Sequence, residues 1–106
     1  MAKKTIYVAG PMSGLTQLNF PAFYAAEKML ADNGWEVVNP ARFSFAFGPN
    51  PEGKMLDACC EAELAAIPHL DAIALLHGWQ HSKGAKRELL VALERDLDVL
   101  IQGEDF

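Results

Sequence analysis

The chain has 106 residues, of which 51% are apolar and 22% are charged. This length and composition predict one globular domain over residues 1–106, and they exclude a two-domain enzyme. Fourteen acidic and nine basic residues give a net charge of −5, which argues against nonspecific binding to the phosphate backbone of bulk nucleic acid. The acidic surplus lies in residues 54–106, so an anionic ligand would depend on local groups there.

The sequence shows no sign of membrane insertion, secretion or metal binding. No run reaches the roughly 18 apolar residues that a membrane span requires, and the apolar stretch near Met1 is too short for a signal peptide. We therefore expect a cytoplasmic protein. Cys59 and Cys60 are adjacent, a spacing that suits neither an ordinary disulfide nor a zinc site, so they are predicted to be free thiols.

The first forty residues predict a strand, a helix and a second strand. The short apolar run 5–9 has the composition of a strand buried on both faces, and Gly10-Pro11 ends it. Pro21 suits the first turn of a helix, which Asn33-Gly34 would stop. Residues 35–39 predict the second strand. The helix would turn one apolar face to the sheet, formed by Phe23, Ala26, Met29 and Leu30.

The remaining residues continue the alternation of helices and strands. Residues 40–54 predict a long loop, 55–67 a helix, 71–76 a strand, 77–83 a loop, 84–95 a helix and 98–102 a last strand. This pattern indicates an α/β fold with a doubly wound parallel sheet of about four strands in the order 2-1-3-4, covered by helices on both faces. Ligands of such sheets bind beyond the carboxyl ends of the strands. Residues 10–15 and 77–88 should therefore surround one crevice.

The loop after the first strand is the first candidate for ligand binding. It contains Gly10, Met12, Ser13 and Gly14, whose glycines permit close backbone approach and whose serine offers a hydroxyl to a phosphate or sugar. It matches neither the GxGxxG nor the Walker pattern, so a simple turn is an equally open interpretation.

The segment from His77 to Glu88 is the second candidate. Ser82 is placed to cap the following helix, whose N-terminus, together with Lys83 and Gly84, would suit an anion. Glu88 shares a face with two small residues, Ala85 and Ala92, which predicts that it faces the sheet. The alternative is a solvated Glu88 paired with Lys86, Arg87 or Arg95.

Three further titratable residues remain as candidates. Glu63 precedes the third strand by eight residues and reaches the crevice only if its helix tilts; otherwise it is a solvated helical charge. His77 and His81 suit acid–base chemistry near neutral pH, or they form a packed surface pair beside Trp79.

Several segments together resemble a known family. In chain order they are Ile6 to Gly14, Asn19-Phe20-Pro21, Val38-Asn39-Pro40-Ala41, Asp71-Ala72-Ile73, and the pattern from Gly78 and Trp79 through Ser82, Gly84 and Ala85 to Glu88. They are similar to a small family of domains of unknown function (DUF4406-like), found largely in phages and prophages and related to nucleoside 2-deoxyribosyltransferases. Those enzymes, and the related deoxynucleoside 5′-monophosphate N-glycosidases, have a flavodoxin-like or Rossmann-like fold and cleave the bond between deoxyribose and a nucleobase.

The resemblance implies a role for each matching residue. Glu88 would be the nucleophile, Tyr7 would orient it, and Glu63 stands where an Asp helps protonate the leaving base. Ser82 matches a serine that contacts the phosphate in the monophosphate glycosidases. Trp79 or the loop aromatics Phe43, Phe45 and Phe47 would stack on the base. The sugar and phosphate would be lined by Gly10, Met12, Ser13, Gly14, Lys83 and Gly84.

Two departures from the family pattern qualify this interpretation. Glu63 is one methylene longer than the family Asp, which leaves His77 or His81 as an alternative acid. Ser82 removes a second carboxylate from the site, which favours a substrate with a 5′-phosphate.

Two hypotheses follow from the resemblance. One is an N-glycosidase or deoxyribosyltransferase for a nucleoside or nucleotide, without metal or organic cofactor. The alternative is a noncatalytic nucleotide-binding or sensing module. The resemblance also implies a homo-oligomer. The aromatic loop from Phe43 to Phe47 is a candidate contact surface for it.

Overall fold

The structure is a computed structural model that describes residues 4–11, 19–41 and 67–106. Its centre is a four-stranded parallel sheet in the order β2-β1-β3-β4, formed by β1 (Thr5–Ala9), β2 (Glu36–Val38), β3 (Ala72–Leu75) and β4 (Asp98–Ile101). Two helices are described, α1 (Phe20–Asp32) and α4 (Lys83–Glu94), with two short 3-10 helices, η2 (Ile67–His69) and η3 (Trp79–His81). The predicted α/β class and strand order are confirmed.

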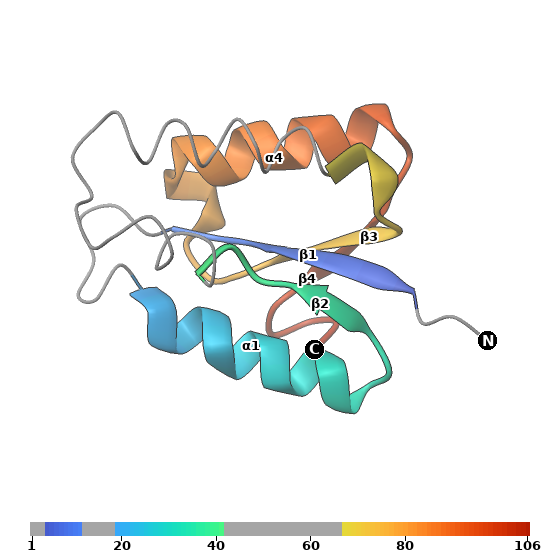
Figure 1. The fold of residues 1–106 in the computed structure, drawn as a ribbon. Coiled ribbons are helices and arrows are strands. Elements are labelled where there is room, and N and C mark those ends of the chain that lie inside the picture. Colours follow the sequence, from blue (N-terminus) through green and yellow to red (C-terminus); the bar gives the residue numbers. More distant parts are fainter. Residues whose placement is uncertain (1–3, 12–18, 42–66) are drawn as a thin grey trace.

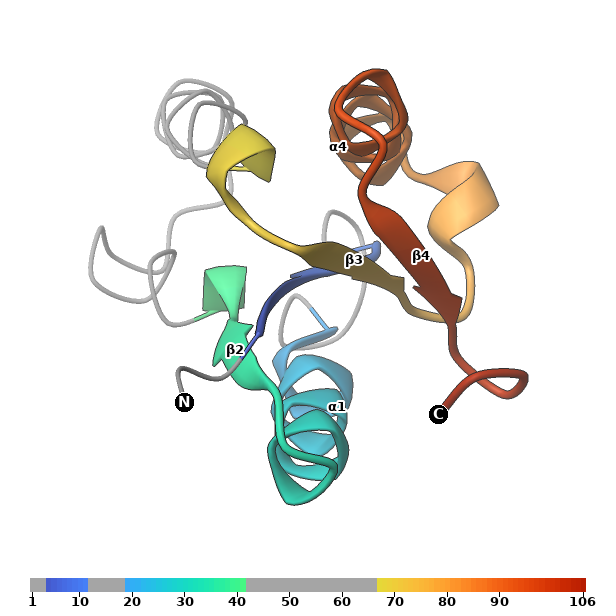
Figure 2. The same cartoon turned by 90° about the vertical axis from the view of Figure 1, so that its right-hand side faces the viewer.

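The two long helices lie on opposite faces of the sheet, α1 on one and α4 on the other (Figures 1 and 2). Successive side chains of a strand point to opposite faces, so each inner strand contributes to two cores. Ile6 and Val8 of β1 pack with Phe23 and Leu30 of α1, whereas Tyr7 and Ala9 belong to the cluster under α4. All residues of β3 are buried, as expected for a strand covered on both sides.

Helix α1 follows the sequence prediction except at one position. Phe23, Ala26 and Leu30 are buried, but Met29 is 46% exposed, so its assignment to the buried face is wrong. Leu30 already occupies the core side of that turn, and a residue one position earlier is rotated away by about 100°. The predicted stop is confirmed, because Gly34 follows the helix with a φ of 95°, a conformation that glycine adopts without strain.

The predicted strands agree with the observed ones to within one residue at either end. The predicted loop 77–83 contains one turn of 3-10 helix, η3, for which the sequence carries no distinct signal. In the part of the chain that the structure describes, no helix is long and apolar enough to cross a membrane.

Candidate functional site

A buried tyrosine–glutamate pair lies between the sheet and α4. The Tyr7 hydroxyl donates a hydrogen bond to the Glu88 carboxylate, at Oε2, across 81 positions of the chain. Tyr7 is fully buried and Glu88 is 6% exposed, which makes Glu88 the one buried charged side chain among the described residues. The predicted proximity of these two residues is confirmed, and the alternative of a solvated Glu88 on the helix surface is wrong.

The alternation of the strand and the periodicity of the helix bring this pair together. Tyr7 points toward α4 because it alternates with Ile6 and Val8, which face α1. On α4 the three buried residues are Ala85, Glu88 and Ala92, the face predicted from their spacing. The two alanines are small, so the helix packs closely on the sheet and the phenol reaches the carboxylate.

Among the described residues, apolar side chains pack around Tyr7. Tyr7 belongs to a cluster with Ala9, Ile67, Ile73 and Leu75, and Trp79 packs against its edge. A carboxylate in such a place is costly unless hydrogen bonds satisfy it, and bonds to a charged group are stronger than those between neutral groups. The hydroxyl of Tyr7 supplies one such bond. The carboxylate therefore has a fixed orientation in a medium that screens charge poorly.

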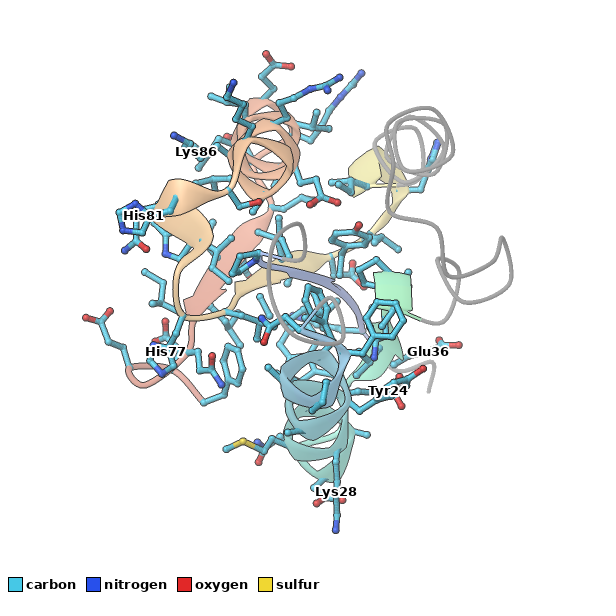
Figure 3. The ribbon with its side chains drawn as sticks, turned by 90° about the vertical axis from the view of Figure 1, so that its left-hand side faces the viewer. Tyr24, Lys28, Glu36, His77, His81 and Lys86 are labelled. Atoms are coloured by element: carbon cyan, nitrogen blue, oxygen red, sulfur yellow. The ribbon has the colours of Figure 1, made fainter. Side chains whose placement is uncertain are left out.

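The N-terminus of α4 lies beside the carboxyl ends of the strands, the edge that faces the viewer in Figure 3. The Ser82 hydroxyl accepts a hydrogen bond from the Ala85 backbone N–H at 3.2 Å, so the predicted cap is confirmed. Lys83 is exposed, and Ser82 and Gly84 are half-buried. Glu88 lies six residues after Ser82, about 9 Å along the helix axis. The end of the helix and the carboxylate can therefore belong to one site.

Gly10 also lies at this edge, directly after β1. A Cβ atom at this position would come within 2.8 Å of the Leu76 Cβ, so Gly10 lets the ends of β1 and β3 approach closely. The backbone behind it is fixed as well, because the Pro11 carbonyl accepts a hydrogen bond from the Asn19 side-chain amide at 3.0 Å. Gly10 thus has a packing role in addition to the predicted ligand contact, which stays a prediction.

The histidines lie on the flank of the molecule. His77 and His81 are both exposed (Figure 3). His77 lies against the C-terminal turn, where its backbone N–H donates to the Gln102 side chain at 2.9 Å and its ring lies 3.1 Å from the place of a Cβ on Gly103. These contacts favour the interpretation of His77 as a packed surface residue.

Several predicted site residues lie outside the described residues. They are Met12, Ser13 and Gly14 of the first loop, Glu63, and the aromatic residues Phe43, Phe45 and Phe47. Their predicted roles stay predictions.

Asn39 is a buried polar residue outside the predicted set of site residues. Its amide nitrogen donates to the Phe23 carbonyl at 3.3 Å, and its side-chain oxygen accepts from the Ala41 N–H at 3.0 Å. It thereby joins the end of β2 to α1. The available signal was an Asn-Pro pair at the end of the predicted second strand, where a short polar side chain often bonds the backbone.

The fold and the site together define a doubly wound α/β domain with a buried carboxylate beside the carboxyl ends of its strands. The chain belongs to the family described as a domain of unknown function (DUF4406), whose model matches residues 4–101. The predicted membership in that small family is therefore confirmed. The comparison with curated proteins gave no match.

Proposed function

We propose that this protein cleaves the N-glycosidic bond of a deoxynucleoside or deoxynucleoside 5′-monophosphate, by hydrolysis or by transfer, with Glu88 as the nucleophile. The observation that carries this proposal is the buried Glu88 carboxylate that accepts the Tyr7 hydroxyl next to the N-terminus of α4. The proposal includes a relationship to the nucleoside 2-deoxyribosyltransferases and a cytoplasmic location.

A carboxylate of this kind suits the chemistry of N-glycosidic cleavage. Cleavage passes through a state in which the sugar resembles an oxocarbenium ion, and a negative charge in apolar surroundings stabilises that cation strongly. A Glu88 oxygen then forms a bond to the anomeric carbon as the carbon–nitrogen bond breaks. The base leaves with the bonding electrons and takes up a proton. Water or a second base attacks the same carbon, gives up a proton to the group that protonated the leaving base, and releases the Glu88 carboxylate.

The other site residues would bind and orient the substrate. Tyr7 would hold the carboxylate toward the anomeric carbon, and the N-terminus of α4 with Ser82 and Lys83 would bind a 5′-phosphate. Trp79 would stack on the base. We assign protonation of the leaving base to Glu63, and contacts with the sugar and phosphate to Gly10, Met12, Ser13, Gly14 and Gly84.

Chromatography of the free base tests the proposal. The protein would be incubated with each deoxynucleoside, its 5′-monophosphate and the ribose counterparts, with and without a second base as acceptor. Glu88→Gln keeps the shape of the side chain and removes the nucleophile, so we expect base release to fall by about 10⁴-fold. Glu36→Gln is the matched control, because Glu36 is an exposed residue of β2, and it should leave the rate unchanged.

Two results would overturn the proposal. One is the absence of free base and of new nucleoside with every substrate of the panel. The other is equal turnover by the wild type and Glu88→Gln. If calorimetry then showed nucleotide binding without product, the protein would be a noncatalytic nucleotide-binding or sensing module.

A further inference from the structure

The outer face of α4 carries two exposed leucines. Leu90 is 59% exposed and Leu93 is 52% exposed, more than any other large apolar side chain in the described part of the chain. With 3.6 residues per turn, Leu90 lies almost opposite the buried residues Ala85, Glu88 and Ala92. Helix α4 forms the top of the molecule in Figure 2, and its outer side faces away from the sheet.

Charged residues flank the leucines in an unusual arrangement. Lys86 and Arg87 precede them and Glu94 follows them, and all three are exposed (Lys86 is labelled in Figure 3). The first turn of α4 contains no acidic residue and its last turn no basic residue; the one basic group at this end is Arg95, the exposed C-cap residue that follows Glu94. This distribution is the reverse of the one that a helix dipole favours, since negative charge stabilises the N-terminus and positive charge the C-terminus.

Nothing within the helix compensates for this charge pattern. None of the residues Lys86, Arg87 and Glu94 has an oppositely charged residue three or four positions away, the spacing at which helical side chains interact. An anion at the N-terminus of α4 would account for the basic residues there, but not for Glu94 or for the exposed leucines. A partner that covers the whole face accounts for all of them.

We propose that this face pairs with the same face of a second copy of the chain, with the two α4 helices antiparallel across a two-fold axis at Leu90. Lys86 and Glu94 lie four residues to either side of Leu90, about 6 Å along the helix axis. The two-fold axis therefore sets Lys86 of each copy against Glu94 of the other, and Arg87 against Leu93. The surface is self-complementary in charge and in apolar contact, as a two-fold interface requires.

This pairing also removes the unfavourable dipole arrangement. In an antiparallel pair, the basic N-terminal half of each α4 lies beside Glu94 of the other. The inference is independent of the proposed function, because it rests on the surface of α4 opposite Glu88. A contact made by one helix from each copy is small, so we expect a reversible dimer with a Kd of about 1 to 100 μM.

Sedimentation velocity measured from about 1 to 500 μM protein tests the proposal, a range chosen around the expected Kd. The wild type should change from monomer to dimer with rising concentration. Leu90→Glu places two carboxylates at the axis and should weaken the dimer by about 100-fold or more. Met29→Glu, at the exposed position of α1, is the matched control and should leave the dimer unchanged.

A pair of charge reversals tests the antiparallel register. Lys86→Glu and Glu94→Lys each create two repulsive contacts and should each weaken self-association by about 10-fold or more. Lys86→Glu places negative charge near the N-terminus of α4, and Glu94→Lys places positive charge near its C-terminus. Both changes are favourable to the helix dipole, so a destabilised helix would not explain weaker self-association. In an equimolar mixture of the two variants, both contacts become attractive, and the mixed dimer should regain wild-type affinity.

The outcomes are decisive in either direction. A wild type that stays monomeric throughout the range would overturn the proposal, as would a dimer that Leu90→Glu leaves intact. Failure of the mixed variants to associate would overturn the antiparallel register. Circular dichroism of each variant would check that the fold is retained.

Discussion

Gly10 shows that a glycine in a predicted ligand-binding loop can also be needed for packing. The residue follows β1, and its lack of a side chain permits the contact with Leu76 at the end of β3. Gly84 differs, because the nearest atom to a Cβ there would be the Ser82 hydroxyl oxygen at 4.0 Å. The two glycines therefore predict opposite effects of the same substitution.

Gly10→Ala should lower the free energy of unfolding by about 1 to 3 kcal/mol, because the added methyl overpacks the contact with the Leu76 side chain. Gly84→Ala should raise it by about 0.5 to 1 kcal/mol, because alanine is the better helix former and the added methyl has room. Urea denaturation of both variants would measure the difference. Equal stability of the two variants would contradict the packing role of Gly10.

At the scale of the element, the local sequence predicts both the ends of α4 and the face that packs on the sheet. Ser82 was a recognisable cap, and the spacing of Ala85, Glu88 and Ala92 indicated the face on the sheet, both of which the structure confirms. The partner of Glu88 was not encoded locally. Only the resemblance suggested Tyr7, because a contact across 81 positions depends on the strand order and on how the helix is seated.

The cap of α4 makes a separate prediction. Ser82→Ala removes the acceptor of the Ala85 N–H and should lower the free energy of unfolding by about 0.5 to 2 kcal/mol. Ser82→Asp restores an acceptor and adds a negative charge at the N-terminus, so it should recover that loss. Thermal denaturation would compare the two variants with the wild type. An Ala variant as stable as the wild type would show that the hydroxyl contributes nothing as a cap.

At the scale of the whole molecule, the two ends of the parallel strands differ in function. The candidate site lies at the carboxyl ends, and hydrogen bonds of Asp71 join the amino ends. One Asp71 carboxylate oxygen accepts hydrogen bonds from the Thr5 backbone N–H at 2.7 Å and from the Thr5 hydroxyl at 3.1 Å. The backbone of Asp71 also bonds to Thr5 at 3.0 Å and to Asp98 at 3.2 Å. One residue thus joins the starts of β1, β3 and β4.

The hydrogen bonds to the Asp71 carboxylate predict that stability depends on pH. The hydrogen bonds from the Thr5 backbone and side chain, aided by the charge of Lys4, hold the pKa of the Asp71 carboxyl below its ordinary value of 3.8. The folded state therefore binds this proton less readily than the unfolded chain. The contribution of Asp71 to stability is complete above the ordinary pKa and is lost as the pH falls through the lowered folded-state pKa.

Asp71→Asn should consequently be less stable than the wild type at pH 7. The difference in the free energy of unfolding between the two proteins should become smaller as the pH falls below about 4. Unfolding curves measured at a series of pH values would give this difference. Asp32→Asn is the matched control, because Asp32 is exposed at the end of α1, and it should show no comparable difference. If the difference in the free energy of unfolding stayed constant to the lowest pH, the charge of Asp71 would contribute nothing to stability. The effect of Asp71→Asn would then come from the altered hydrogen-bonding group alone.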